Sequence, residues 1–400
     1  MACRKRPEAR TATPSGWIAR LERENHERIH TNFQILEQPG RFGTEKRSEI
    51  SLDQFNAFHQ AIIRETTTDL SELPLILSIE ELGLAALFAL AFANGANDAG
   101  KSVASLMMPG PSGSPPRRKP LIWGGFFTGV GSVSAILISG RLFTVFTPQT
   151  LLHTTPESSF VLAALAGATL WILAATLLRL PVSSTHAIIG AIVLLAIYLF
   201  GISVVQWEFL LYRVVLPLAG GPIAALVGIY FLDRLTRRTG APGKPRPRLA
   251  SIEHWGSGAA VSYARGINDA PKMAALGAFF LLANPSEAAW VPYSIVAVAV
   301  LLGSLVLGHR VVVTAIGRHA ALDQVQRSKA GAATALVVSA GAFLGAPMST
   351  TQVHEGSNAG IGGRGSVIKS SLKSMLLPWL VTLPAAGVLA IVVSYVGAMI

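Results

Sequence analysis

Two stretches of the chain decide the fold, because they repeat one another. Residues 93–104 read ANGANDAGKSVA and residues 264–275 read ARGINDAPKMAA, so seven of twelve aligned positions are identical. A second pair follows: residues 181–190 read PVSSTHAIIG and residues 347–356 read PMSTTQVHEG. The offsets within the two pairs, 171 and 166 residues, are nearly equal. Two motifs in the same order at nearly the same separation indicate an internal duplication.

The composition places this duplication in a membrane. Hydrophobic residues make up 51% of the 400 residues and charged residues only 14%, whereas about a quarter of a soluble domain is charged. Repeated apolar runs are typical of membrane-spanning helices, so we expect an all-α polytopic membrane protein. A soluble enzyme is excluded for most of the chain. Nucleic-acid binding is excluded because the basic residues lie between apolar spans. The single cysteine, Cys3, excludes a disulfide framework and a cysteine metal cluster.

Polar segments divide the chain into four parts. We expect residues 1–80 to form a polar tail, with an amphipathic helix at 51–64 that opens on a Ser-x-x-Gln capping box. Residues 81–232 and 251–400 are the two expected membrane repeats. Residues 233–250 form a basic linker between them. No apolar stretch of secretory-signal length follows the first basic residues.

Basic loops predict how the two repeats lie in the membrane. Lys and Arg gather at residues 117–119, 233–250, 310–329 and 364–373. Because such loops stay in the cytoplasm, the repeats should have inverted topology, with both termini outside. Several apolar runs are shorter than the roughly 20 residues that cross a bilayer, or are interrupted by Gly and Pro. We therefore expect broken helices and re-entrant helical hairpins. The expected location is the plasma membrane of a bacterium, with an organelle envelope as the alternative.

Each copy of the first motif places an acid and a base on one helical face. Asp98 and Lys101 are three residues apart, and so are Asp269 and Lys272. We expect each pair just past a break in its helix. An ionised group at mid-membrane costs about 2.5–3.5 kcal/mol, so the pairs are either internal salt bridges or parts of an ion path; their repetition favours the path. Arg265 either pairs with an acid or adds positive charge to an anion site.

Each copy of the second motif places three hydroxyl groups after a proline. They belong to Ser183, Ser184, Thr185, Ser349, Thr350 and Thr351. Proline ends the incoming helix and Ser or Thr caps the outgoing one. Hydroxyls and free N–H groups at a helix N-terminus bind anions, and two copies favour this over ordinary capping. His186 and His354 follow at unaligned positions. We expect packed, hydrogen-bonded imidazoles there, with a proton relay as the alternative.

These motifs resemble those of the inorganic phosphate transporter (PiT) family. The resemblance rests on the Asn-Asp motif and the Pro-x-Ser-Ser/Thr-Thr motif in each half, and it covers about residues 80–400. It implies inverted repeats, hairpins that meet near the membrane centre, and cation-coupled uptake of phosphate. It assigns the phosphate to the six hydroxyls with Asn97 and Asn268. It assigns the coupling cation, H⁺ or Na⁺, to Asp98 and Asp269.

The sequence departs from the common family pattern at the position three residues after each Asp. Many members have Asn there, but this chain has Lys101 and Lys272. Arg265 and Gln352 stand where many members have His. A lysine ammonium has three donors and no acceptor, so it cannot coordinate Na⁺. Our hypothesis is that the two lysines act as tethered cations, with Arg265 adding to the charge balance, which favours H⁺ coupling or exchange.

Three alternatives stay open. The transported anion could be sulfate or another tetrahedral oxyanion, or the chain could be a sensor that binds without transport. Two intramembrane aspartates could also share a proton, as in an aspartyl protease, but each has a lysine on its face. We expect no enzyme activity and no cofactor. The expected partners are inorganic phosphate and the lipid bilayer, without nucleic acid, and a homodimer is left open.

Overall fold

The structure is a computed structural model that describes most of the region with the motifs. The described residues are 78–107, 118–238, 247–281, 290–312, 314, 322–362 and 365–399, and side chains are described outside 236–250 and 362–379. The predicted polar tail lies outside the described residues apart from its last three positions. The predicted helix at 51–64 lies wholly outside them.

The described residues form an all-helical fold, with one isolated β-bridge between Leu152 and Val205. The first half contains α3 (Ile79–Ser102), η2 (Ala104–Met107), α4 (Lys119–Ile138), α5 (Gly140–Val145), α6 (Pro148–Leu151), α7 (Ser158–Leu177), α8 (Ser184–Phe200), η3 (Ile202–Val204), α9 (Trp207–Phe209), η4 (Leu210–Val215) and α10 (Leu216–Arg238). The second half contains α11 (Pro247–Ala278), η5 (Phe279–Leu281), α12 (Trp290–Leu307), α14 (Gln324–Leu344), α15 (Thr350–Gly362) and α16 (Gly365–Gly397). Helices α10 and α11 both extend into the predicted linker.

Six helices among the described residues are long and apolar enough to cross a membrane. They are Ile79–Ser102, Lys119–Ile138, Ser158–Leu177, Trp207–Leu235, Trp290–Leu307 and Leu380–Gly397. Six of the apolar runs therefore lie in helices of membrane length, whereas the run at 188–200 lies in α8, which has 17 residues. Helix α11 is not among the six. Its central charged side chains, which belong to the second Asn-Asp motif, lower its hydropathy.

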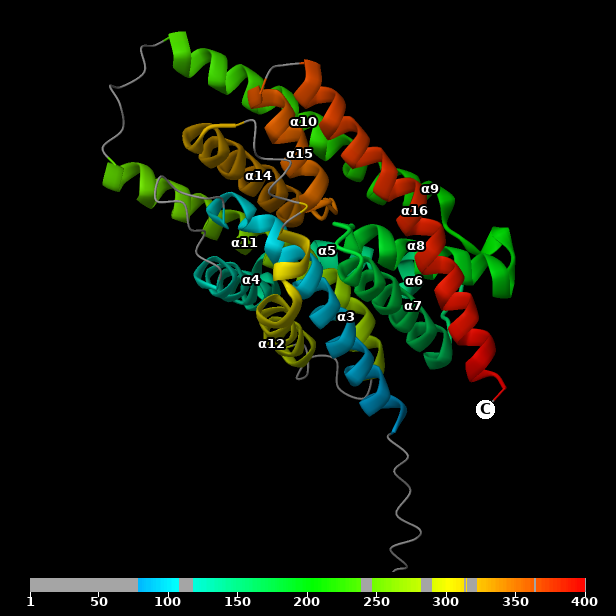
Figure 1. Cartoon of the computed structure of the whole chain (residues 1–400). Helices are drawn as coiled ribbons and strands as arrows, with labels where there is room; N and C mark the ends of the chain where they lie inside the picture. Colours follow the sequence, from blue (N-terminus) through cyan, green and yellow to red (C-terminus); the bar gives the residue numbers. More distant parts are fainter. Residues whose placement is uncertain are drawn as a thin grey trace, which may run out of the picture. The chain divides into compact units, whose positions relative to one another are not determined.

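The two halves do not fold as separate units, because helices of one half pack against helices of the other. Helix α3 of the first half packs on α12 of the second, and α11 of the second half packs on α4 of the first (Figure 1). The later helices do the same, because α16 packs on α8 and α10 packs on α15. Each half therefore completes its core with helices of the other, and the two motif-bearing helices lie inside one bundle.

Glycines allow the helices of the two halves to approach each other closely. A methyl group at Gly95 would lie 2.2 Å from the carbonyl oxygen of Val300, and one at Gly303 would lie 2.0 Å from a backbone oxygen of α3. The contact of α4 with α11 has the same form, because methyl groups at Gly131 and Gly266 would lie 2.3 and 2.2 Å from backbone oxygens. Small residues let membrane helices approach this closely, so the motif glycines serve helix packing.

The Asn-Asp motifs do not break their helices, and that prediction was wrong. Helix α3 runs unbroken through Asp98, and α11 through Asp269. Pro271 lies inside α11 and cannot donate to the carbonyl of Ile267. The hydroxyl of Ser139 donates to that carbonyl instead, at 2.8 Å. Because a neighbouring side chain satisfies the freed carbonyl, α11 continues through the proline.

The interruptions lie instead at the tips of two helical hairpins. Helix α7 ends at Leu177 and α8 begins at Ser184, with Pro181 between them. In the second half α14 ends at Leu344 and α15 begins at Thr350. The two proline motifs therefore stand between an incoming and an outgoing helix, as predicted, and each outgoing helix begins among the hydroxyl residues.

Candidate functional site

Asn97 holds the tip of the α7–α8 hairpin. Its Nδ2 donates to Thr176 Oγ1 at 2.9 Å and to the carbonyl oxygen of Leu180 at 3.0 Å. Its Oδ1 accepts a hydrogen bond from the backbone N–H of Val182 at 3.0 Å. The buried amide of Asn97 thus uses both its donor and its acceptor side to fix the segment that precedes Ser183.

Asn268 makes the corresponding contact in the second half. Its Oδ1 accepts from the backbone N–H of Met348 at 3.1 Å, and its Nδ2 donates to the carbonyl oxygen of Met348 at 2.9 Å. Met348 aligns with Val182 in the duplicated sequence. The same Nδ2 also donates to Asp269 Oδ1 at 2.8 Å. The two halves therefore share one arrangement, in which the motif asparagine binds the backbone of its hairpin tip.

Lys101 lies beside Asn97 and is almost fully buried. Its ammonium donates to Asn97 Oδ1 at 3.1 Å and to the carbonyl oxygen of Val182 at 2.6 Å. It also forms an ion pair with Asp98 Oδ1. Three oxygens of different kinds therefore surround the ammonium. The acid and the base three residues on form an internal salt bridge, which the sequence left as the alternative to an ion path.

Lys272 forms the corresponding ion pair with Asp269 and also contacts the other hairpin. Its ammonium forms an ion pair with Asp269 Oδ1 at 3.0 Å and donates to the carbonyl oxygen of Met348 at 3.0 Å. It also donates to Thr185 Oγ1, on the other hairpin, at 2.7 Å. Thr185 Oγ1 in turn lies 3.5 Å from the carbonyl oxygen of Met348. The two hairpin tips therefore adjoin, and Lys272 bridges them.

Arg265 also connects the two halves. Its Nη1 donates to the backbone carbonyl oxygen of Asp98, and its Nε lies 3.8 Å from Asp98 Oδ2. The side chain is only about 1% exposed. Of the two roles that the sequence left open, the structure shows the pairing with an acid, and that acid belongs to the other half of the chain.

Most of the predicted hydroxyl residues are buried at the tips. The buried ones are Ser183, Ser184, Thr185, Ser349 and Thr350, while Thr351 is half-buried. Within the described part of the chain, Ser349 Oγ and Thr350 Oγ1 have no hydrogen-bond partner. Ser183 precedes α8, but its side chain does not cap the helix. A buried hydroxyl without a partner is costly, and the hydroxyls of Ser349 and Thr350 share this property at one tip.

The polar character of α15 was missed in the sequence. Glu355, Ser357 and Asn358 are buried in this helix, whereas the aligned stretch of α8 is apolar. Ser357 accepts a hydrogen bond from Thr334 Oγ1 at 3.0 Å, and His354 Nδ1 lies 3.3 Å from the same hydroxyl. The signal was present in the quoted motif, which reads HEG where the first copy reads IIG. The two hairpins therefore differ chemically beyond their tips.

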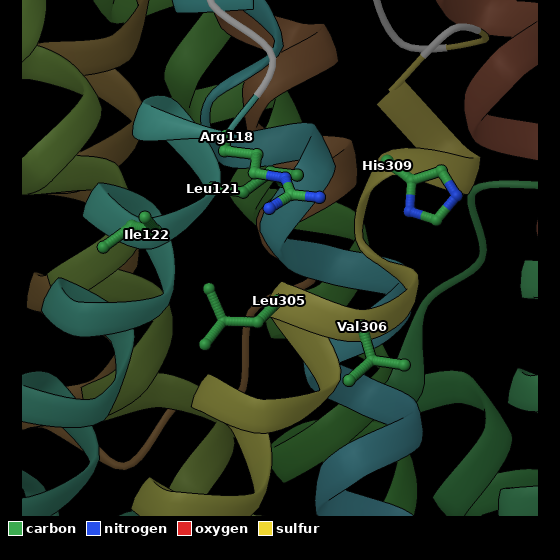
Figure 2. Close-up of a pocket in the computed structure, with 6 residues that line it drawn as sticks. All are labelled: Arg118, Leu121, Ile122, Leu305, Val306 and His309. Atoms are coloured by element: carbon green, nitrogen blue, oxygen red, sulfur yellow. The ribbon is translucent and has the colours of Figure 1, made fainter. Parts of the chain in front are cut away.

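A pocket of about 620 Å³ lies apart from the tips, between α4 and α12. Figure 2 shows the side chains of Arg118 and His309 at one end of it, with Leu305 and Val306 nearby. Leu121 and Ile122 complete the lining. None of these residues belongs to the duplicated motifs, so the pocket is separate from the candidate anion site.

Comparisons with known proteins show which family this chain resembles. A family model described as "Phosphate transporter family" matches residues 94–390. A probable low-affinity inorganic phosphate transporter of Mycobacterium bovis is 33% identical over 243 residues, which cover 57% of this chain and 57% of that relative. The match thus spans little more than half of the relative's length. A putative phosphate permease of Pyrococcus horikoshii is 26% identical over 383 residues, covering 76% of this chain and 94% of the relative.

One solved structure has the same fold. It is named "The sodium-dependent phosphate transporter", and it matches with a TM-score of 0.69 at 20% sequence identity. The match covers 81% of this chain and 100% of the other. At this identity the likeness shows a shared arrangement of helices.

Proposed function

The chain belongs to the phosphate transporter family, and from this premise we propose that it is a secondary active transporter of inorganic phosphate. In the proposal, phosphate crosses the membrane between the two hairpin tips by alternating access. A cation, H⁺ or Na⁺, moves with it and supplies the driving force.

The unpartnered hydroxyls of Ser349 and Thr350 are the observation that carries the proposal. They lie at the N-terminus of α15, where free N–H groups and the helix dipole favour an anion. Ser183 and Ser184 occupy the same place at the start of α8. The two Asn-Asp motifs add three basic and two acidic side chains nearby, and the ammonium of Lys272 donates to Thr185 at the first tip. Hydroxyls with positive charge suit a phosphate oxyanion.

The other motif residues take supporting roles in this proposal. Asn97 and Asn268, predicted among the phosphate ligands, use their amides on the tip backbone. We assign them the role of holding the hydroxyl-bearing tips. Asp98 and Asp269 keep the predicted coupling role. Each lies against a lysine ammonium, and Asp269 Oδ2 has no hydrogen-bond partner among the described residues.

Inverted repeats and re-entrant hairpins complete the proposed mechanism. Helices α8 and α15 have 17 and 13 residues, fewer than the roughly 20 that cross a bilayer. In Figure 1, α3 begins and α16 ends toward the lower end of the helices, whereas α10 ends and α11 begins toward the upper end. This placement supports halves of opposite direction, with the linker and the other basic loops in the cytoplasm. Bacterial relatives support a bacterial plasma membrane.

The pairing of the aspartates weighs against a protease. Asp98 contacts Lys101 and Arg265, and Asp269 contacts Lys272. Two carboxylates that share a proton must face each other closely, and these have separate basic partners. A transporter family is also not an enzyme family.

Uptake of radiolabelled phosphate into proteoliposomes tests the proposal. The native protein should accumulate phosphate, and excess unlabelled phosphate should inhibit uptake more strongly than sulfate does. Uptake should fall in the double variant Ser349→Ala/Thr350→Ala and be lost in Asp98→Asn and Asp269→Asn, with membrane insertion intact. Ser134→Ala is the control, because this hydroxyl donates to the carbonyl oxygen of Val130 in its own helix. Normal uptake in the hydroxyl variant would reject the site, and stronger inhibition by sulfate would change the substrate.

A further inference from the structure

We propose that the ammonium groups of Lys101 and Lys272 are the resident cations of the site. Each fills an oxygen cage that would otherwise take a mobile monovalent cation, so phosphate transport needs no sodium at either place. This inference rests on the proposed function, and it concerns how that same site is coupled.

The cage around Lys101 has the composition of a cation site. It consists of a carboxylate oxygen of Asp98, the amide oxygen of Asn97 and the backbone carbonyl oxygen of Val182. Carbonyl oxygens from non-helical backbone are the groups that transporters use to coordinate sodium. Here the Val182 carbonyl belongs to such a segment, the tip before α8.

The cage around Lys272 shares two of its three kinds of oxygen with the cage around Lys101. It consists of a carboxylate oxygen of Asp269, the hydroxyl oxygen of Thr185 and the backbone carbonyl oxygen of Met348. The partner atoms lie 2.7–3.0 Å from the ammonium nitrogen. Carboxylate and tip carbonyl are therefore common to both cages, and only the third oxygen differs.

Each ammonium matches its cage in number as well as in charge. A lysine ammonium has three N–H donors. Lys272 donates to three oxygens, and Lys101 donates to two and forms an ion pair with Asp98 Oδ1. Both side chains are buried, and each charge has a carboxylate partner. Since burying an unpaired charge at this depth is expensive, the cages are built for the cations they hold.

A mobile sodium ion would have to displace the ammonium to reach these oxygens. Two positive unit charges within a few ångströms of each other repel strongly in a medium of low dielectric constant. The lysine is covalently attached and stays after each cycle. The fixed charges on Lys101 and Lys272 therefore balance Asp98 and Asp269 without sodium, and the coupling role of the two aspartates is left to a proton.

The test is uptake of radiolabelled phosphate by the full-length protein in proteoliposomes, with sodium or choline as the only external cation at a fixed pH gradient. The native protein should show equal rates in sodium and choline. Lys101→Asn and Lys272→Asn remove the ammonium and add an amide oxygen, so both variants should lose uptake in choline. Lys329→Asn is the matched control, because Lys329 forms its ion pair with Asp233, at 3.1 Å, outside the motifs. It should keep the native rate in both salts.

A second readout does not depend on transport. Sodium chloride, compared with choline chloride, should raise the thermal unfolding temperature of the purified Lys→Asn variants but not that of the native protein. A sodium-induced shift of the native protein equal to that of the variants would overturn the inference. A strict sodium requirement of native uptake would do the same and leave the proposed function standing. Absence of phosphate uptake in every salt would instead reject the proposed function.

Discussion

The ammonium of Lys272 donates a hydrogen bond of 2.7 Å to the hydroxyl of Thr185, which belongs to the other half of the chain. The aligned base, Lys101, bonds within its own half, to Asn97, Asp98 and Val182. The duplicated motif is therefore used asymmetrically: one lysine closes its own cage, and the other joins the two hairpin tips.

Replacing Thr185 with Val should weaken the junction between the tips. Val keeps the shape but removes the acceptor, and a hydrogen bond to a charged group contributes about 1.5–3 kcal/mol. We expect a lower free energy of unfolding and reduced phosphate uptake. Thr185→Ser keeps the hydroxyl and should behave like the native protein. Thermal unfolding and uptake, measured side by side, check this, and equal behaviour of Val and Ser would contradict it.

Replacing Asn97 with Asp should release the first hairpin tip. Asp has the size of Asn but cannot donate to Thr176 or to the Leu180 carbonyl. We expect the tip to loosen and uptake to fall. The natural cysteine, Cys3, can be replaced and a reporter introduced by Ser183→Cys. Thiol labelling of that reporter should be faster with Asp than with Asn at position 97.

The control for this experiment is the same reporter beside Thr176→Ser. Ser keeps the hydroxyl that accepts from Asn97, so labelling should stay slow. If Asp at position 97 leaves the labelling rate unchanged, the amide does not hold the tip.

The duplicated sequence allowed much of this site to be predicted. Alignment of the two halves identifies the hydroxyl residues, the two Asp–Lys pairs and the prolines between helices. These residues stand out because the same residue types recur at matching positions, which chance does not explain. The positions of the interruptions at the hairpin tips followed from Pro181 and Pro347, since proline restricts the backbone wherever it stands.

Other features depend on packing that one sequence does not reveal. Gly95 and Gly266 lie in the motifs where the sequence predicts helix breaks, yet they admit the backbones of α12 and α4. A glycine permits both outcomes, and only the neighbouring helix decides between them. Arg265 had two open roles because its partner, Asp98, lies 167 residues away. The buried Glu355 was overlooked because its aligned position in the first half is apolar.

Replacing Gly266 with Ala should destabilise the contact between α11 and α4. The added methyl would lie 2.2 Å from the carbonyl oxygen of Thr128, and such overpacking costs about 1–3 kcal/mol. Gly228→Ala is the control, since a methyl group at that helical position meets nothing within 4 Å. Unfolding followed by intrinsic fluorescence should show a lower transition temperature for the first variant only. Equal transitions would mean that the two helices can separate without cost.

Replacing Ser139 with Ala should leave a buried carbonyl of α11 without a partner. Pro271 has no N–H to donate to the carbonyl oxygen of Ile267. The Ser139 hydroxyl donates to that oxygen instead, at 2.8 Å. An unsatisfied buried acceptor costs about 1–3 kcal/mol, and the loss should appear as a lower free energy of unfolding. Ser134→Ala is the matched control, because that exposed hydroxyl bonds to Val130 in its own helix. Its free energy of unfolding should change by less than about 0.5 kcal/mol.

Pairing Ser139→Ala with Pro271→Ala separates the causes. Ala at position 271 restores the helical N–H donor and should recover most of the lost stability, whereas an additive loss would show that Ser139 acts through another contact.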